Sequence, residues 1–181
     1  MPFPIPLEPD GVSLRLLEAG DGRARLDAYE RNREHLAPWD PERSEEFFTE
    51  EHQAGIVATM LESHAEGNAL PLVIADGESI VGFVNLSSIV RGILQNAVLG
   101  YWLDRSYTGR GIMGRAVNAV IAVARDELEL HSLQAGTLVN NVASQRILLG
   151  AGFERIGIAP RYLKIAGSWQ DHILFQRLLE D

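Results

Sequence analysis

The chain has 181 residues, of which 46% are hydrophobic and 23% are charged, which is enough for one domain with a full hydrophobic core. Its net charge of −9 argues against nucleic acid as a partner, because no long basic stripe offsets the acidity. The sequence has no cysteine, which excludes disulfides, a thiol nucleophile and thiolate metal sites.

The N-terminal residues 1–11 are rich in proline and are expected to form an extended lead-in. They do not resemble a signal peptide, because no basic segment is followed by an apolar one. No apolar run reaches the length that spans a membrane. We therefore expect a soluble, cytoplasmic protein without a membrane partner, with residues 1–181 forming a single domain.

Alternating apolar residues predict a first strand at residues 12–16, and a helix is expected at about residues 21–35. Pro38 must end any helix that precedes it. A second helix is predicted at about residues 45–64, with Ser44 as its N-cap. The acidic residues near its start are typical of a solvated face, and a rim that attracts cations is the alternative.

The next predicted elements form a β-hairpin. Its strands are expected at residues 70–75 and 79–86, joined by the tight turn that Asp76-Gly77 favours. Residues 90–96 are expected to form a loop or a short strand. A further strand is predicted at residues 97–103, where the sequence is almost entirely apolar.

A glycine-rich turn follows this strand. Gly109, Gly111 and Gly114 surround Arg110, and from Ile112 the apolar residues recur with helical spacing. Glycines let a ligand approach the backbone, and the first N–H groups of a helix have no intrahelical partner. The pattern therefore predicts an anion site suited to phosphate, with a plain strand-to-helix turn as the alternative. Three arginines add positive charge around the turn: Arg105, Arg110 and Arg115.

Two known phosphate motifs fit this stretch less well. The three glycines satisfy the dinucleotide pattern G-x-G-x-x-G, but five residues separate the strand from the turn. The next strand ends in Asn140-Asn141, where that motif expects an acidic residue. The spacing of a P-loop is also present, but Arg115-Ala116 stands where Lys-Ser/Thr is needed.

Four elements are expected after the long helix, in the order strand, helix, strand, strand: residues 132–139, 141–149, 153–158 and 168–178. A loop through Pro160 and Lys164 is expected to join the last two strands. Gly150-Ala151-Gly152 provides the stop for the short helix.

Several segments together resemble the GCN5-related N-acetyltransferases (GNAT), and within them the RimJ/RimL-type branch. The strand, turn and helix around Gly111 resemble motif A of that family. Residues 141–153 contain the pattern N-x-x-S followed by G-F, which is similar to a family signature. Residues 32–39 resemble a segment near the acceptor site of the branch, and residues 167–172 its closing strand. The resemblance covers roughly residues 12–179.

This resemblance implies an α/β fold in which a mixed, mostly antiparallel sheet is flanked by helices. It also implies transfer of an acetyl group from acetyl-coenzyme A to a primary amine by direct attack. The acceptor would be a protein N-terminus or a small amine. The residues implied in binding acetyl-coenzyme A are Trp102, Leu103, Thr108, Gly109, Arg110, Gly111, Ile112, Met113, Gly114, Asn141 and Ser144.

The resemblance also implies roles for three side chains. Ser144 would protonate or hydrogen-bond the leaving thiolate, although an ordinary serine in the first turn of a helix is the alternative. His35 and Trp39 would lie on the acceptor side, and the alternative for Trp39 is a buried ring at a helix terminus.

The catalytic base is not identified, because Val98 and Leu163 stand where related sequences often have carboxylates. His35, Asp171 and His172 are weak candidates. Water is an alternative base, and an amine that binds already neutral would need none.

The glycine turn itself departs from the family pattern, with Thr108 in place of Gln/Arg and Met113 in place of Gly/Ala. No cluster of His, Asp or Glu has metal-ligand spacing, so no metal is expected. A coenzyme A-binding module with little catalysis is the alternative function, and a dinucleotide-binding protein is a second one. The oligomeric state is left open, with a homodimer as one option.

Overall fold

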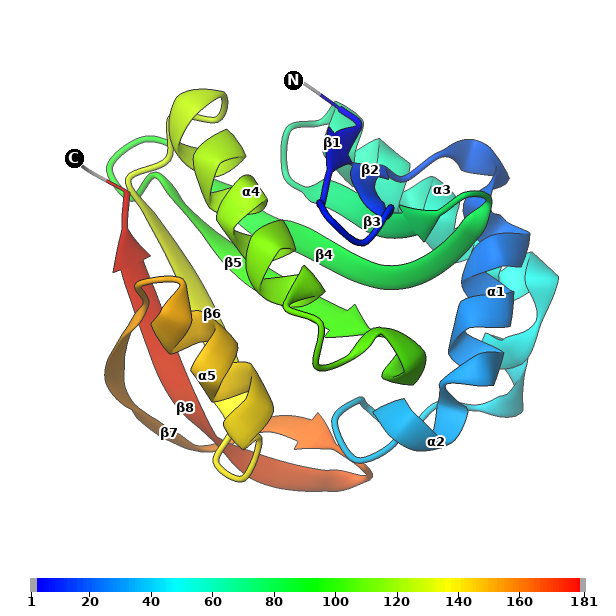
Figure 1. Cartoon of the computed structure of the whole chain (residues 1–181). Coiled ribbons are helices and arrows are strands. Elements are labelled where there is room, and N and C mark those ends of the chain that lie inside the picture. The colour runs from blue at the N-terminus through cyan, green and yellow to red at the C-terminus, as the bar shows by residue number, and fades with distance from the viewer. Residues whose placement is uncertain (1–2, 180–181) are drawn as a thin grey trace.

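The computed structural model describes residues 3–179, and the first two residues of the expected lead-in lie outside that range. Within these residues, eight strands form one sheet in the order β1-β2-β3-β4-β5-β6-β8-β7 (Figure 1). The strands are β1 (Ile5–Pro6), β2 (Ser13–Leu16), β3 (Leu70–Asp76), β4 (Ser79–Val90), β5 (Asn96–Leu103), β6 (Ser132–Leu138), β7 (Glu154–Ile165) and β8 (Ser168–Leu178).

The described part of the chain also has five α-helices: α1 (Gly22–Arg31), α2 (Arg33–Leu36), α3 (Glu50–Ala65), α4 (Ile112–Asp126) and α5 (Val142–Gly150). Short 3-10 helices precede α1, α3 and α4: Ala19–Asp21, Glu45–Phe48 and Arg105–Tyr107. No helix within residues 3–179 combines the length and the apolar character needed to cross a membrane.

The sheet is mixed and mostly antiparallel, which confirms the predicted fold class. Every strand pair is antiparallel except β5 and β6, which run parallel and are connected through α4. A dinucleotide-binding fold is built on a mostly parallel sheet. The topology is therefore inconsistent with the dinucleotide alternative.

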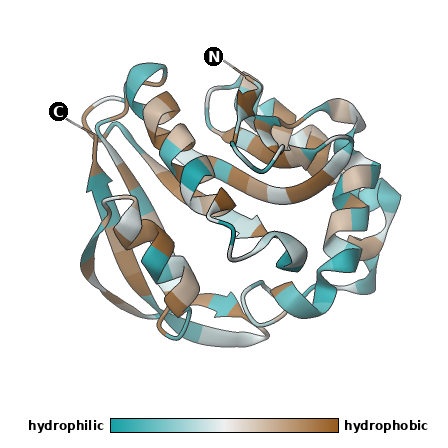
Figure 2. Cartoon of the chain, viewed as in Figure 1, coloured by the Kyte–Doolittle hydropathy of each residue, from teal (hydrophilic) through white to brown (hydrophobic). Residues whose placement is uncertain are grey.

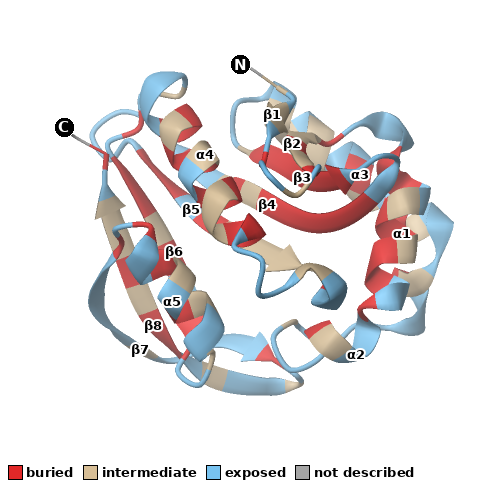
Figure 3. Cartoon of the chain, in the orientation of Figure 1, coloured by how far each residue is buried: buried red, intermediate tan, exposed pale blue. Residues whose placement is uncertain are grey.

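The two faces of the sheet bury different helices, because side chains alternate along each strand. Leu72 and Ile74 of β3 share a buried cluster with Val120 of α4, whereas Val73 between them packs with Ala28 of α1 and Val57 of α3. Figure 3 shows that β3 is almost wholly buried between these layers and that much of β4 is buried too, while β7 is largely exposed. Apolar residues of α4 recur with helical spacing and form one face that packs on the sheet, and polar residues lie between them along the helix (Figure 2).

The parallel pair β5–β6 separates after a short contact, and this separation positions the site. Only residues 96–98 of β5 pair with residues 132–134 of β6. Beyond them, β5 continues beside β4 and β6 continues beside β8. The two strands diverge toward the end of the sheet where α4 begins (Figure 1). Backbone groups on the facing edges are therefore left for another partner.

The prediction of one continuous helix at residues 21–35 is wrong in one respect, because the helix breaks at Asn32. This residue has φ −108° and ψ 11°, and α1 ends before it. Its side-chain amide donates to the carbonyl of Ala28 at 2.9 Å and to the carboxylate of Asp104 at 2.8 Å. The break is therefore caused by a buried contact with a distant segment.

The helix expected at residues 45–64 is also divided. Residues 45–48 form a 3-10 turn, and α3 begins at Glu50. Thr49 is the N-cap, since its side chain accepts a hydrogen bond from the amide of His52 at 3.3 Å, whereas Ser44 makes no side-chain cap bond. The prediction of Ser44 as the N-cap of a single helix is wrong.

The lead-in contains extended backbone, since β1 pairs with β2, and Leu7 is buried. One loop prediction needs correction. The expected loop through Pro160 and Lys164 is part of β7, and the turn to β8 lies at Ala166-Gly167. Pro160 is tolerated because the register of β7 against β8 shifts between Ala159 and Leu163.

Candidate active site

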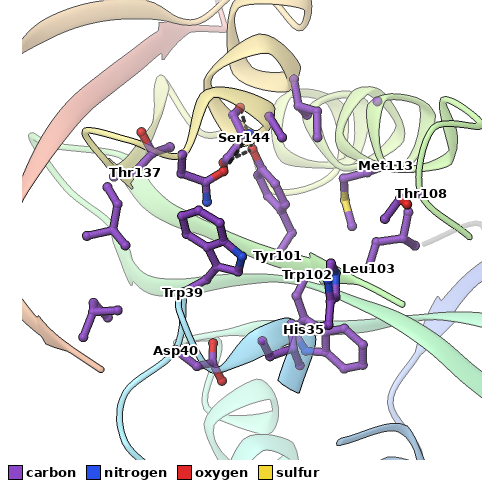
Figure 4. A pocket seen from close by; sticks show the side chains of 18 of the residues that line it. His35, Trp39, Asp40, Tyr101, Trp102, Leu103, Thr108, Met113, Thr137 and Ser144 are labelled. Carbon is purple, nitrogen blue, oxygen red and sulfur yellow. Dashed lines mark hydrogen bonds between the residues drawn. The ribbon is translucent and has the colours of Figure 1, made fainter. Parts of the chain in front are cut away.

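A cavity of about 620 Å³ lies where β5 and β6 diverge. Its walls come from α2 and the segment after it, β5, the glycine turn, the start of α4, β6, α5 and the β7–β8 hairpin. Figure 4 shows part of this lining. The cavity brings together these residues predicted from the sequence: His35, Trp39, Trp102, Leu103, Thr108, Gly109, Gly111, Met113, Gly114, Asn141 and Ser144.

Two of the predicted binding residues do not line the cavity. The side chain of Ile112 is fully buried in the core beneath α4. The guanidinium of Arg110 donates to the carboxylate of Asp10 at 2.9 Å, and Arg115 pairs with the same carboxylate. Asp10 therefore offsets part of the positive charge that the arginines were expected to supply.

The glycine turn has the geometry of an anion site. Gly109 and Gly111 have φ of 75° and 73°, in the left-handed region that side chains other than glycine rarely adopt. Gly111 is the N-cap of α4, so the free N–H groups and the positive end of the helix dipole lie beside it. A Cβ at Gly109 or Gly114 would meet no atom within 4 Å, so the space beside these glycines is open.

A hydroxyl pair forms the opposite wall. The Tyr101 hydroxyl and Ser144 Oγ are 2.8 Å apart, and the Tyr101 hydroxyl also donates to the Ser144 carbonyl at 3.2 Å. The amide N–H of Ser144 donates to Oδ1 of Asn141 at 3.1 Å, so Asn141 is the N-cap of α5. Burial raises the pKa of Tyr101 to about 12, and its hydroxyl is therefore protonated at neutral pH.

Tyr101 was not predicted as a site residue. The available sequence signal was a hydroxyl-bearing side chain in an otherwise apolar strand next to the glycine turn. That signal does not indicate which residue Tyr101 contacts, because the contact with Ser144 joins β5 to α5 across the diverging strands.

A buried carboxylate fixes the start of the glycine turn. Asp104 is 2% exposed and accepts hydrogen bonds from Arg31 Nε at 2.7 Å, from Asn32 Nδ2 at 2.8 Å and from the Ser106 amide at 2.9 Å. Burial by itself would raise the pKa of Asp104, but the hydrogen bonds from Ser106, Asn32 and Arg31 outweigh it and lower the pKa to about 2. Asn32 also accepts from the Arg105 amide at 3.0 Å, so the α1–α2 junction is tied to the turn.

The positions considered for a catalytic base differ in location. His172 lines the cavity, whereas Asp171 is exposed and accepts from the Arg161 amide at 2.8 Å. Leu163 lines the cavity, but Val98 is 38% exposed and lies outside the lining. A carboxylate at position 98 would therefore not face this cavity in the present structure.

Besides Tyr101, the lining contains two more polar residues that the sequence did not predict. Asp40 follows Trp39 directly and contributes a carboxylate. Thr137 of β6 has a buried hydroxyl without a hydrogen-bond partner among the described residues. Nothing local in the sequence marks either residue, because their place in the cavity depends on how distant elements pack.

Comparison with known proteins assigns the family. Residues 12–154 match the model of the acetyltransferase (GNAT) domain. The ribosomal protein uS5-alanine N-acetyltransferase of Escherichia coli (strain K12) is 32% identical over 94% of this chain and 89% of its own length. The crystal structure of the ribosomal-protein-S5-alanine acetyltransferase from Vibrio fischeri is 36% identical, covers 96% of both chains and superposes with a TM-score of 0.92.

A second similar structure contains the coenzyme as its disulfide. Mycobacterium smegmatis RimJ, in complex with CoA-disulfide, is 29% identical, with a TM-score of 0.87 over 92% of this chain and 81% of that one. These matches confirm the predicted resemblance to the RimJ/RimL-type branch. The chain therefore belongs to the GNAT acetyltransferase family and is an acyltransferase.

Proposed function

We propose that this protein transfers an acetyl group from acetyl-coenzyme A to a primary amine by direct attack, without an acyl-enzyme intermediate. The acceptor is the α-amino group of a polypeptide, with a small amine as the alternative. The observation that carries this proposal is the cavity between the diverging strands β5 and β6, at the N-terminus of α4. Relatives named for acetylation of a ribosomal-protein alanine support the choice of acceptor.

The glycine turn is the proposed holder of the pyrophosphate of acetyl-coenzyme A. The backbone N–H groups from Gly109 to Gly114 would supply hydrogen-bond donors at the positive end of α4, whereas the amide of Thr108, at the start of the turn, already donates to the Arg105 carbonyl at 3.3 Å. The pantetheine arm would lie along the free edge of β5, at the backbone of Trp102 and Leu103, as an added strand does. Asn141 borders the same space from the start of α5.

Two features of this geometry would assist the chemical step. A backbone N–H at the end of β5 can polarise the thioester carbonyl, which develops negative charge during attack. The hydroxyl pair of Tyr101 and Ser144 can donate a proton or a hydrogen bond to the departing thiolate. The raised pKa of Tyr101 keeps that donor protonated.

The proposed co-substrate can be tested by calorimetric titration of acetyl-coenzyme A into the wild type, Gly111→Asp and Gly111→Asn. Both side chains impose the same strain at φ 73°, and both would meet only the flexible end of Arg115 at 3.0 Å. Only aspartate adds a negative charge where the pyrophosphate is expected, so affinity should fall about 100-fold in that variant alone. Circular dichroism checks that both variants are folded.

An acceptor screen separates the enzyme from a coenzyme A-binding module. Thiol release is measured with peptides carrying a free N-terminal alanine or serine, the same peptides blocked at the N-terminus, and small amines. Turnover with the free peptides alone supports the proposal. Tight binding of acetyl-coenzyme A without turnover on any acceptor would favour the module, and absence of binding by the wild type would refute both.

A further inference from the structure

The cavity contains one carboxylate among the described residues that line it, and that carboxylate belongs to Asp40. It lies just after α2, in the segment that contributes His35 and Trp39 to the same wall. In Figure 4, Asp40 lies at one end of the cavity and Ser144 at the other, with the ring of Trp39 between them. Asp40 is therefore well separated from the Tyr101 and Ser144 hydroxyls, which would donate a proton to the leaving thiolate.

Asp40 is held in place from three directions. Its amide donates to the Leu36 carbonyl at 3.0 Å, which continues the end of α2. Its own carbonyl accepts from the amide of Ala166 at 3.0 Å, in the turn between β7 and β8. Arg43 donates to Oδ2 at 3.2 Å. A carboxylate anchored in this way is preorganised, which is what a group that orients a substrate requires.

Asp40 also borders a second cavity of about 320 Å³, and Leu36 is the other residue that the two cavities share. The second cavity is lined by aromatic and basic side chains, including Phe48 and Arg33, whose guanidinium lies 4.1 Å from the centre of the Phe48 ring. The side chain of Asp40 is 23% exposed. Asp40 therefore borders the cavity proposed for acetyl transfer on one side and the second cavity on the other, and its side chain can exchange a proton with solvent.

We propose that Asp40 binds the ammonium group of the acceptor and takes its proton, while the rest of the bound acceptor polypeptide extends through the second cavity. This inference rests on the proposed acetyltransferase function. It supplies the base that the sequence did not identify. Glu42, another carboxylate nearby, lines only the second cavity and is not in contact with the transfer site.

The charges around Asp40 are compatible with this role. The titratable groups that surround it in the two cavities and from α1 are Arg25, Tyr29, Arg33, His35, Glu42, Arg43, Tyr101 and His172. Burial raises the pKa of Asp40, and the nearby Arg43 and Arg25 oppose that shift. A raised pKa makes the carboxylate a better proton acceptor than an exposed one, since its basicity is closer to that of the amine.

The reaction balances as follows. The acceptor ammonium gives one proton to the Asp40 carboxylate, and the resulting neutral amine attacks the thioester carbonyl carbon. The C–N bond forms and the carbonyl electron pair moves to oxygen; when it returns, the C–S bond breaks and the thiolate leaves with a proton from the Tyr101–Ser144 side. The second proton of the nitrogen passes through water to the Tyr101–Ser144 pair and replaces the proton given to the thiolate, and the proton on Asp40 passes to solvent. The products are the N-acetyl peptide, the free thiol and one proton released.

The test compares Asp40→Asn with Asp40→Glu and with Glu34→Gln, an exposed carboxylate of α2 that lines neither cavity. We measure kcat and KM for a peptide with a free N-terminus across the pH range, and acetyl-coenzyme A affinity by calorimetry. In Asp40→Asn, kcat/KM should fall about 100-fold, and its activity should rise with pH as hydroxide replaces the base. Acetyl-coenzyme A affinity should stay within about twofold, and Asp40→Glu should recover part of the rate and the wild-type pH profile.

Each outcome has a distinct meaning. If the wild type is active and Asp40→Asn matches Glu34→Gln at every pH, the role of Asp40 is refuted while the acetyltransferase function stands. If Asp40→Asn also loses acetyl-coenzyme A binding and Asp40→Glu recovers neither, the residue is structural and the inference fails. If the wild type acetylates no amine, the proposed function itself is refuted.

Discussion

Replacing Asp104 by alanine removes the carboxylate that joins the α1–α2 junction to the glycine turn. The side chain is 2% exposed and accepts from Arg31, Asn32 and Ser106. Hydrogen bonds to a charged group contribute about 1.5–3 kcal/mol each, but Arg31 is partly exposed and regains water when its partner is lost. We therefore expect the free energy of unfolding to fall by about 3 kcal/mol, which is a decrease in Tm of roughly 6–12 °C.

The assay is urea unfolding followed by circular dichroism, with Asp126→Ala as the control. Asp126 pairs with Arg125 on the surface of α4, and its removal should cause no measurable loss. The m-value should stay constant, since the unfolded chain exposes the same surface. A loss for Asp104→Ala that equals the control would refute the view that this network stabilises the site.

The pH dependence provides a second check on the same carboxylate. The pKa of Asp104 is lowered to about 2 in the folded protein, from its ordinary value of 3.8. A group with a depressed folded pKa stabilises the protein above its unfolded pKa, and the contribution is lost as the pH falls through the folded value. The difference between wild type and Asp104→Ala should be constant above about pH 5 and shrink between about pH 4 and pH 2. A difference that does not shrink there would show that ionisation of Asp104 is not its source.

Three further predictions concern the cavity and the core. Tyr101→Phe and Ser144→Ala should each lower kcat about tenfold without weakening acetyl-coenzyme A binding, and the double variant should lose less than the product, because the two hydroxyls act as one unit; full additivity in thiol-release assays would contradict this. Asp10→Asn should strengthen acetyl-coenzyme A binding several-fold at low salt, because it frees two arginines beside the glycine turn; calorimetry showing unchanged affinity would contradict it. Leu133→Ala, at a fully buried position of β6, should lower the free energy of unfolding by about 2–5 kcal/mol, as measured by urea unfolding. A smaller loss would indicate that neighbouring core residues fill the space left by the leucine side chain.

Local patterns predicted much of the fold because they act over a few residues. The Asp76-Gly77 hairpin, the glycine turn and the long helix after it all occur where the sequence places them. The predictions failed where a distant segment competes with local preference. Asn32 interrupts a helical sequence because its side chain bonds to Asp104, and β7 continues through Pro160 because its register shifts there.

The sequence by itself determined the family and the place of the glycine turn that is the proposed anion site, because glycine spacing and helical periodicity are local properties that need no knowledge of packing. It also supplied half of the residues that line the cavity, since those residues lie in motifs. Only the tertiary structure decided that Tyr101 faces Ser144 and that Asp40 enters the same cavity. These contacts depend on the divergence of β5 and β6 and on the turn between β7 and β8, which are long-range pairings that no local pattern encodes.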